Sequence, residues 1–121
     1  MPMPQDVLFV EDNMMIVMDV EHCLQDLGVD HVRIAANVPE AMSAIAERTP
    51  DFAILDYSLE SETSEPIAVK LRELGVNFIF ATGHDELTDK SAELGAIGVI
   101  LKPYMSADLR RALAAVPEPA N

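Results

Sequence analysis

Several features are scarce in this sequence, and each scarcity excludes something. Cys23 is the single cysteine, so no disulfide can form within the chain. Eight basic residues stand against 21 acidic ones, and the net charge of −13 repels the phosphates of nucleic acids, so direct DNA binding is not expected. The first six residues lack both the basic segment and the apolar run of a signal peptide, which predicts a cytoplasmic protein. No apolar stretch approaches the roughly 20 residues that span a bilayer.

The composition nevertheless supports a folded core. Half of the 121 residues are hydrophobic, which is enough to bury a sheet within one domain and leaves no room for a second. We expect residues 6–115 to form this domain, preceded by a short extension at residues 1–5. Residues 116–121 contain two prolines and are expected to form a flexible tail.

Short apolar segments alternate with segments of helical periodicity. Apolar runs predict strands at residues 7–10, 31–35, 52–55, 78–81 and 97–101. Periodicity and terminal signals predict helices at residues 13–27, 39–47, 65–74, 85–94 and 106–115. The first helix has the clearest pattern, because one of its faces carries Ile16, Val20, Cys23, Leu24 and Leu27.

Strict alternation of strand and helix predicts the fold class. Runs that are apolar on both faces are typical of a parallel sheet covered by helices on both sides, so we expect an α/β fold with a doubly wound, five-stranded sheet and five helices. The expected strand order is 2-1-3-4-5, in which the topology switches between the first and third strands. Ligands of such sheets bind at the carboxyl ends of the strands, and the polar residues there are the candidates for function.

Five polar residues follow the ends of these strands. Glu11 and Asp12 follow the first strand, Asp56 the third, Thr82 the fourth and Lys102 the fifth. Three carboxylates held close together repel one another unless a cation neutralises them. A small set of oxygen ligands favours Mg²⁺ over a full calcium cage, and the absence of a histidine or cysteine cluster argues against zinc. The sequence therefore predicts a magnesium site.

The same residues provide what in-line phosphoryl transfer needs, namely a nucleophile, neutralising charge and fixed positions. Asp56 is the predicted nucleophile, because it stands alone at the end of its strand while Glu11 and Asp12 form a pair. Lys102 supplies a point positive charge beside the metal. Each residue alone has an ordinary structural explanation, such as a solvated turn or a helix cap, so the hypothesis depends on their conjunction.

Together these residues resemble the CheY-like receiver domain of two-component response regulators, over residues 6–115, and this family has a flavodoxin-like fold. The resemblance implies that Glu11 and Asp12 are the acidic pair that binds Mg²⁺ and that Asp56 is the phosphoacceptor and a metal ligand. It also implies that the backbone carbonyl of Ser58 is a metal ligand. Such a domain catalyses only its own phosphoryl transfer and dephosphorylation and is not an enzyme in the usual sense.

The resemblance assigns two further roles: Thr82 is the switch hydroxyl, and Lys102 is the phosphate-binding lysine, joined to Pro103 by a cis peptide bond. Two positions depart from the family pattern. The loop at residues 57–64 lacks the usual Met-Pro and Gly, and Val99 replaces an aromatic residue that moves together with the switch threonine. The switch is then expected to act through the helix after Thr82.

Two other polar residues near the predicted site are candidates for a role there. His84 is placed to line the phosphoryl site, and Tyr104 is a candidate replacement for the missing aromatic residue. For each, the simpler explanation is structural, an exposed loop histidine and a tyrosine packed under the last helix.

The Phe-Ala-Thr-Gly stretch at residues 80–83 and the Glu-Thr-x-x-Pro stretch at residues 62–66 resemble a receiver subgroup named for its Phe-Ala-Thr-Gly (FAT GUY) motif. Its members are often stand-alone receivers in alphaproteobacteria that work with HWE-class histidine kinases, in some cases in stress signalling. The resemblance implies a single-domain regulator that is phosphorylated by a sensor histidine kinase or a phosphotransfer protein. Its output would be contact with a downstream protein.

Two other functions compete with this interpretation. A pseudo-receiver that binds its partner without phosphorylation is favoured by the altered loop and by Val99, but the complete acidic and lysine set argues against it. An aspartyl-phosphate phosphatase would need a second acid two residues after the nucleophile, and Ser58 holds that position.

Overall fold

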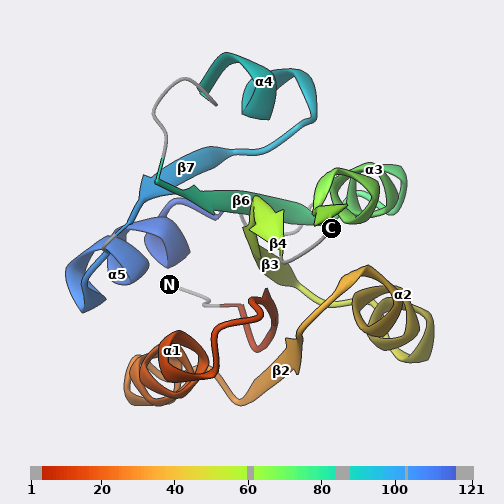
Figure 1. Cartoon of the computed structure of the whole chain (residues 1–121). Coiled ribbons are helices and arrows are strands. Elements are labelled where there is room, and N and C mark those ends of the chain that lie inside the picture. The colour runs from red at the N-terminus through yellow and green to blue at the C-terminus, as the bar shows by residue number, and fades with distance from the viewer. Residues whose placement is uncertain (1–3, 60–61, 84–87, 103, 117–121) are drawn as a thin grey trace.

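The computed structural model describes residues 4–59, 62–83, 88–102 and 104–116 and shows a parallel sheet between two layers of helices (Figure 1). The sheet consists of β1 (Asp6–Val10), β2 (His31–Ala35), β3 (Phe52–Asp56), β6 (Asn77–Thr82) and β7 (Gly98–Leu101). Its order is β2-β1-β3-β6-β7, with every neighbouring pair parallel. The predicted order 2-1-3-4-5 of a doubly wound sheet is therefore confirmed.

Helices cover both faces of the sheet. They are α1 (Met14–Asp26), α2 (Val38–Glu47), α3 (Glu65–Glu73), α4 (Thr88–Glu93) and α5 (Ser106–Ala114). Figure 1 shows α2 and α3 on one face, α1 and α5 on the other, and α4 beside β7. Four helices match their predicted ranges within a residue or two, whereas residues 85–87, the predicted start of the fourth, lie outside the described part of the chain. No described helix has the length and hydrophobicity for a membrane crossing.

The core is divided by the sheet, because successive side chains of a strand point to opposite faces. In β1, Val7 and Phe9 pack against α1 and α5, whereas Leu8 and Val10 join the cluster beneath α2 and α3. All four side chains are fully buried. Burial on both faces of the sheet explains why the strands appear in the sequence as continuous apolar runs.

The buried face of α1 differs slightly from the predicted one. The fully packed residues are Val17, Val20 and Leu24, and Val17 was not among the predicted positions. Ile16 and Cys23 are half-buried at the border of the same cluster. The face is therefore rotated toward Val17, which belongs to the same cluster as Leu109 and Leu113 of α5. The spacing within one helix cannot reveal such a neighbour.

The segment after β3, expected to be a loop, contains a small antiparallel pair of strands. β4 (Ser58–Leu59) pairs with β5 (Glu62–Thr63). The buried side chain of Leu59 anchors the pair in the core. Glu62 Oε2 also accepts a hydrogen bond of 3.0 Å from the backbone N–H of Val38 at the start of α2. This pair therefore links the end of β3 to α2.

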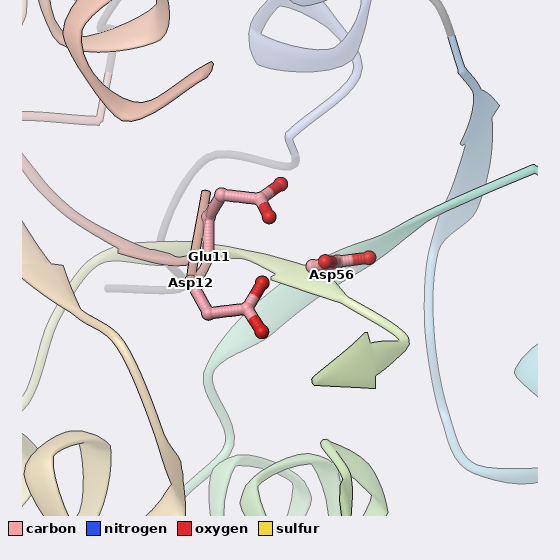
Figure 2. Close-up of side chains that lie close together, drawn as sticks. All are labelled: Glu11, Asp12 and Asp56. Atoms are coloured by element: carbon pink, nitrogen blue, oxygen red, sulfur yellow. The ribbon is translucent and has the colours of Figure 1, made fainter. Parts of the chain in front are cut away.

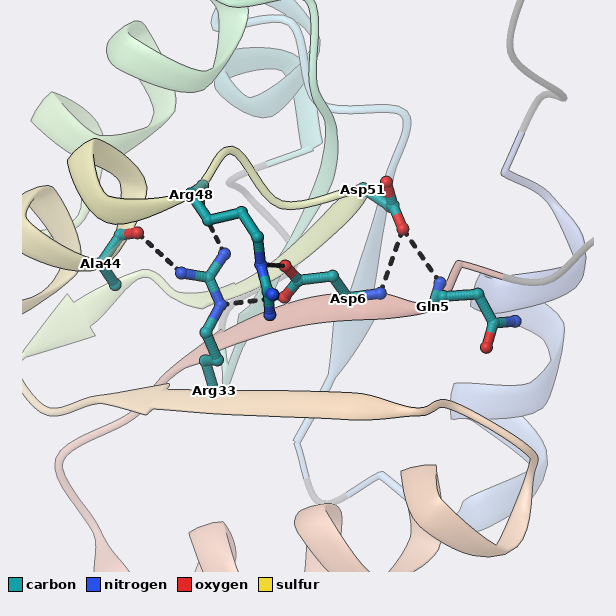
Figure 3. A network of polar contacts seen from close by, with 6 residues as sticks. All are labelled: Gln5, Asp6, Arg33, Ala44, Arg48 and Asp51. Carbon is teal, nitrogen blue, oxygen red and sulfur yellow. Dashed lines mark hydrogen bonds and ion pairs between the residues drawn. The ribbon is translucent and has the colours of Figure 1, made fainter.

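A polar network ties β1, β2 and α2 together near the start of β1 (Figure 3). Asp6 is buried and forms ion pairs with Arg33 (2.9 Å) and Arg48 (2.6 Å). Arg33 also donates to the carbonyls of Ala44 and Arg48, both at 2.7 Å. Arg33 therefore binds the carboxyl end of α2, where the carbonyl of Ala44 also accepts a hydrogen bond of 3.1 Å from the backbone N–H of Arg48. The network lies at the strands' amino ends, away from the candidate site.

Candidate functional site

Three carboxylates meet at the carboxyl ends of β1 and β3. Glu11 and Asp12 directly follow β1, and Asp56 is the last residue of β3. Each residue offers one oxygen, and these oxygens all lie within 4.8 Å of one another. Figure 2 shows the three side chains close together at this edge of the sheet. The backbone N–H of Glu11 donates to the carbonyl of Ala35 (3.0 Å), which fixes the start of the turn. The predicted proximity of the three acids is confirmed.

Glu11 is the most deeply buried of the three, with only 1% of its surface exposed. Its Oε2 accepts a hydrogen bond of 3.2 Å from the backbone N–H of Asn13, whose side chain in turn caps α1. Its Oε1 accepts no hydrogen bond from the described residues. Burial, together with the neighbouring carboxylate of Asp56, raises the pKa of Glu11 to about 7, although Lys102 opposes the rise. The site is therefore short of positive charge.

Lys102 directly follows β7 and approaches two of the acids. Its Nζ lies 3.1 Å from Asp56 Oδ1 and 3.3 Å from Glu11 Oε1. Burial alone would lower the pKa of Lys102, but Asp56 and then Glu11 raise it above its ordinary value, so the side chain stays charged. One lysine thus approaches two of the three carboxylates, and its single positive charge does not balance the acidic group. This set of oxygen donors fits a hard divalent cation such as Mg²⁺.

The end of β6 holds the neighbouring strands in position. The carbonyl of Ala81 accepts from the backbone N–H of Tyr57 (3.0 Å), and the carbonyl of Thr82 accepts from that of Lys102 (2.8 Å). Thr82 is buried, with 4% of its surface exposed. The backbones that carry Asp56, Thr82 and Lys102 are thus fixed to one another, as the predicted strand order requires.

Other predicted residues are less directly placed. Ser58 begins β4, and its side chain is exposed, although the resemblance assigns its backbone carbonyl rather than its hydroxyl. Val99 is half-buried on β7 and paired with Phe80. The hydroxyl of Tyr104 is buried without a hydrogen-bond partner among the described residues, and burial followed by the charges of Glu11 and Asp56 raises its pKa. His84 and Pro103 lie outside the described residues.

The sequence interpretation missed Tyr57. Its hydroxyl donates to Glu65 at the start of α3, and its ring stacks edge-on against Phe80 with centroids 5.6 Å apart. The only signal in the sequence is its position directly after Asp56. Its partners come from other elements, so the contact depends on the complete fold.

Comparisons with known proteins agree with this geometry. A family model described as the response regulator receiver domain matches residues 7–114. The chain is 31% identical over 100 residues to the sensory transduction protein LytR of Staphylococcus haemolyticus, and the aligned residues cover 80% of this chain and 39% of LytR. It is 33% identical over 87 residues to the positive alginate biosynthesis regulatory protein of Pseudomonas aeruginosa, covering 70% of this chain and 35% of that one.

A solved structure covers nearly the full chain. The chemotaxis protein CheY4 of Vibrio cholerae is 26% identical, with a TM-score of 0.85 over 94% of this chain and 99% of its own. By contrast, the chain spans about two fifths of the length of the first curated relatives it matches. The similarity to those regulators therefore concerns one of their parts.

Proposed function

The chain belongs to the response regulator receiver domain family, and we propose that it accepts a phosphoryl group on Asp56 with the help of Mg²⁺. Receiver domains are phosphoacceptor signalling domains rather than classical enzymes. One observation carries the proposal for this chain: three carboxylates have oxygens within 4.8 Å of one another, and Lys102 lies 3.1 Å from Asp56. A nucleophile, a cation site and a fixed positive charge therefore stand together.

The proposed ligands of Mg²⁺ are the side chains of Glu11, Asp12 and Asp56 and the backbone carbonyl of Ser58. When bound, the metal neutralises charge on the phosphoryl oxygens. An oxygen of Asp56 attacks the phosphorus of a phosphorylated histidine, an O–P bond forms, the P–N bond breaks, and the imidazole leaves with its electron pair.

Two further residues complete the proposed site. The ammonium group of Lys102 neutralises charge that develops on the transferred group. The hydroxyl of Thr82 donates a hydrogen bond to a phosphoryl oxygen once transfer is complete. The pairing of β6 with β3 and with β7 supports both roles, because it brings the ends of these strands to the same edge of the sheet as Asp56.

Receiver domains generally interact with histidine kinases and with downstream effectors. We propose a sensor histidine kinase, of the HWE class, or a phosphotransfer protein as the phosphoryl donor, and a downstream protein as the target. The net charge of −13 supports a protein target over a nucleic acid. Residues 6–115 would act as a stand-alone receiver in the cytoplasm, with residues 1–5 and 116–121 as flanking segments.

The test is labelling with acetyl phosphate or with a phosphorylated kinase, followed by mapping of the modified residue. Asp56→Asn should abolish labelling, and so should an excess of chelator. Asp30→Asn, which changes an exposed aspartate outside the site, serves as the control and should be labelled like the wild type. Undiminished labelling of Asp56→Asn at a residue outside the site would refute the assignment.

The pseudo-receiver remains a second candidate, because Val99 provides no ring for the usual switch. It predicts that the folded wild-type chain takes no label from any donor and binds its partner equally well as Asp56→Asn. Labelling of Asp56 together with a phosphorylation-dependent affinity for the partner would exclude this candidate.

A further inference from the structure

Tyr57 connects the phosphoacceptor strand to the end of β6. It directly follows Asp56, and its backbone N–H donates to the carbonyl of Ala81, the neighbour of Thr82. Its ring packs against Phe80 on the same strand. Its own carbonyl accepts a hydrogen bond of 2.9 Å from the backbone N–H of Ser64, which precedes α3. A displacement at Asp56 or at the end of β6 therefore changes the surroundings of Tyr57 directly.

The side chain of Tyr57 extends this connection to α4. Its hydroxyl donates to Glu65 Oε2, and the same oxygen lies 2.7 Å from Lys90 Nζ. Lys90 Nζ also lies 5.9 Å from the centroid of the Tyr57 ring, within the range of a cation–π contact. Glu65 belongs to α3 and Lys90 to α4. The residue that follows β3 thus meets two helices at one carboxylate.

The six residues of α4, Thr88–Glu93, include no large apolar side chain, and the apolar anchors of this segment are Leu94 and Ala96, which follow the helix and pack against the cluster beneath α2 and α3. The helix itself is therefore held largely by polar contacts. Near its carboxyl end, Arg72 of α3 donates a hydrogen bond of 2.9 Å to the carbonyl of Glu93. Glu65 and Arg72 lie near opposite ends of α3, so α3 holds α4 at two points. Elements with few buried apolar contacts open at low free energy, and loss of one such contact is expected to loosen the helix.

We propose that Tyr57, Glu65 and Lys90 form a latch, which holds α4 against α3 in the unphosphorylated protein. Phosphorylation of Asp56 opens this latch. The opening step rests on the proposed function. A phosphoryl group adds a charge of about −1.5 to −2 beside Tyr57, and movement of Thr82 toward it shifts the strand end on which Tyr57 packs. The latch gives the signal a route to α4 that needs no aromatic ring at Val99.

Hydrogen exchange of the full chain tests the latch. The reporters are the backbone N–H groups of Leu94 and Ala96, which donate to the carbonyls of Lys90 (3.0 Å) and Ser91 (2.9 Å). Tyr57→Phe removes only the hydroxyl, and the loss of one hydrogen bond should raise exchange at these amides about two- to tenfold. Amides in α1 should keep their wild-type rates, which separates local opening from global unfolding.

A charge-matched pair of variants tests the third member. Lys90→Gln should raise exchange at the same amides as Tyr57→Phe does, whereas Lys70→Gln removes an exposed lysine of α3 and should leave the rates unchanged. Addition of beryllofluoride with Mg²⁺, a phosphoryl mimic, should raise exchange in the wild type and in Lys70→Gln. The further increase should be smaller in the two latch variants, because their latch is already open.

Two results would overturn the proposal: wild-type exchange rates in both latch variants before the mimic is added, or the same fold-change in all four proteins afterwards. The first comparison needs no phosphoryl group, so it judges the latch independently of the proposed function. If the mimic changed no amide of the wild type, the phosphoacceptor role and the opening step would both fail, while faster exchange in the variants would still support the hold on α4.

Discussion

Replacing Glu11 with glutamine removes a charge from the acidic site while nearly preserving the shape of the side chain. Only 1% of the surface of Glu11 is exposed, and its pKa rises from an ordinary value of 4.5 to about 7. A rise of this size corresponds to about 3 kcal/mol, because each pKa unit is equivalent to about 1.4 kcal/mol. The perturbation should therefore have a measurable effect on the free energy of unfolding.

The sign follows from where the proton is held. Between pH 4.5 and about 7 the folded protein keeps a proton on Glu11 that the unfolded chain has lost, so in the absence of metal the stability of the wild type falls as pH rises through this window. Glutamine does not titrate. The variant should match the wild type near pH 4.5 and exceed its stability above pH 7 by up to about 3 kcal/mol.

Urea unfolding in chelator at pH 5 and pH 8 measures this difference, and comparison of the two proteins cancels the contributions of the groups that they share. Mg²⁺ should then stabilise the wild type at pH 8 more than Glu11→Gln, because a metal that binds only the folded state raises its stability. Parallel pH profiles of the two proteins in chelator would refute the argument, since they would show that Glu11 titrates alike in both states.

Two further predictions concern Lys102 and Asp6. Lys102→Gln should bind Mg²⁺ severalfold more tightly than the wild type in a fluorescence or calorimetric titration, because the lysine competes with the metal for Asp56. The same variant should be labelled more slowly by acetyl phosphate. Weaker Mg²⁺ binding by the variant would contradict this competition. Asp6→Asn should lower the free energy of unfolding in urea by about 2–4 kcal/mol, because it leaves Arg33 without its buried partner. A loss no greater than that of the exposed control Asp30→Asn would show that the network contributes little.

The sequence predicted the sheet and its site well because both depend on local patterns. Buried strands of a parallel sheet are apolar on both faces, and their ends are marked by the polar residues that follow them. Asp56 and Lys102 are 46 positions apart, yet their proximity was predicted because the carboxyl ends of parallel strands share one edge of the sheet. Val17 and the β4–β5 pair were missed because both depend on packing against other elements.

The latch was missed for a related reason. Tyr57, Glu65 and Lys90 each have an ordinary explanation in the sequence, as a half-buried aromatic, a helix-start acid and a surface lysine. Their meeting at one carboxylate depends on the angle between α3 and α4 and on side-chain conformations. Helical or strand periodicity carries no information about such contacts.

The two carbonyls at the end of β6 have a consequence for sequence change over evolution or in engineering. Because they bind the backbones of Tyr57 and Lys102, the spacing of the site is set by strand register rather than by the connecting loops. A residue inserted in the loops beyond the strand ends leaves that register intact. A one-residue slip of β7 against β6 would displace Lys102 by about 3.3 Å and turn its side chain to the other face of the sheet. Loop length can therefore vary beyond Asp12 and Ser58, whereas the proposed phosphoryl site tolerates no shift in strand pairing.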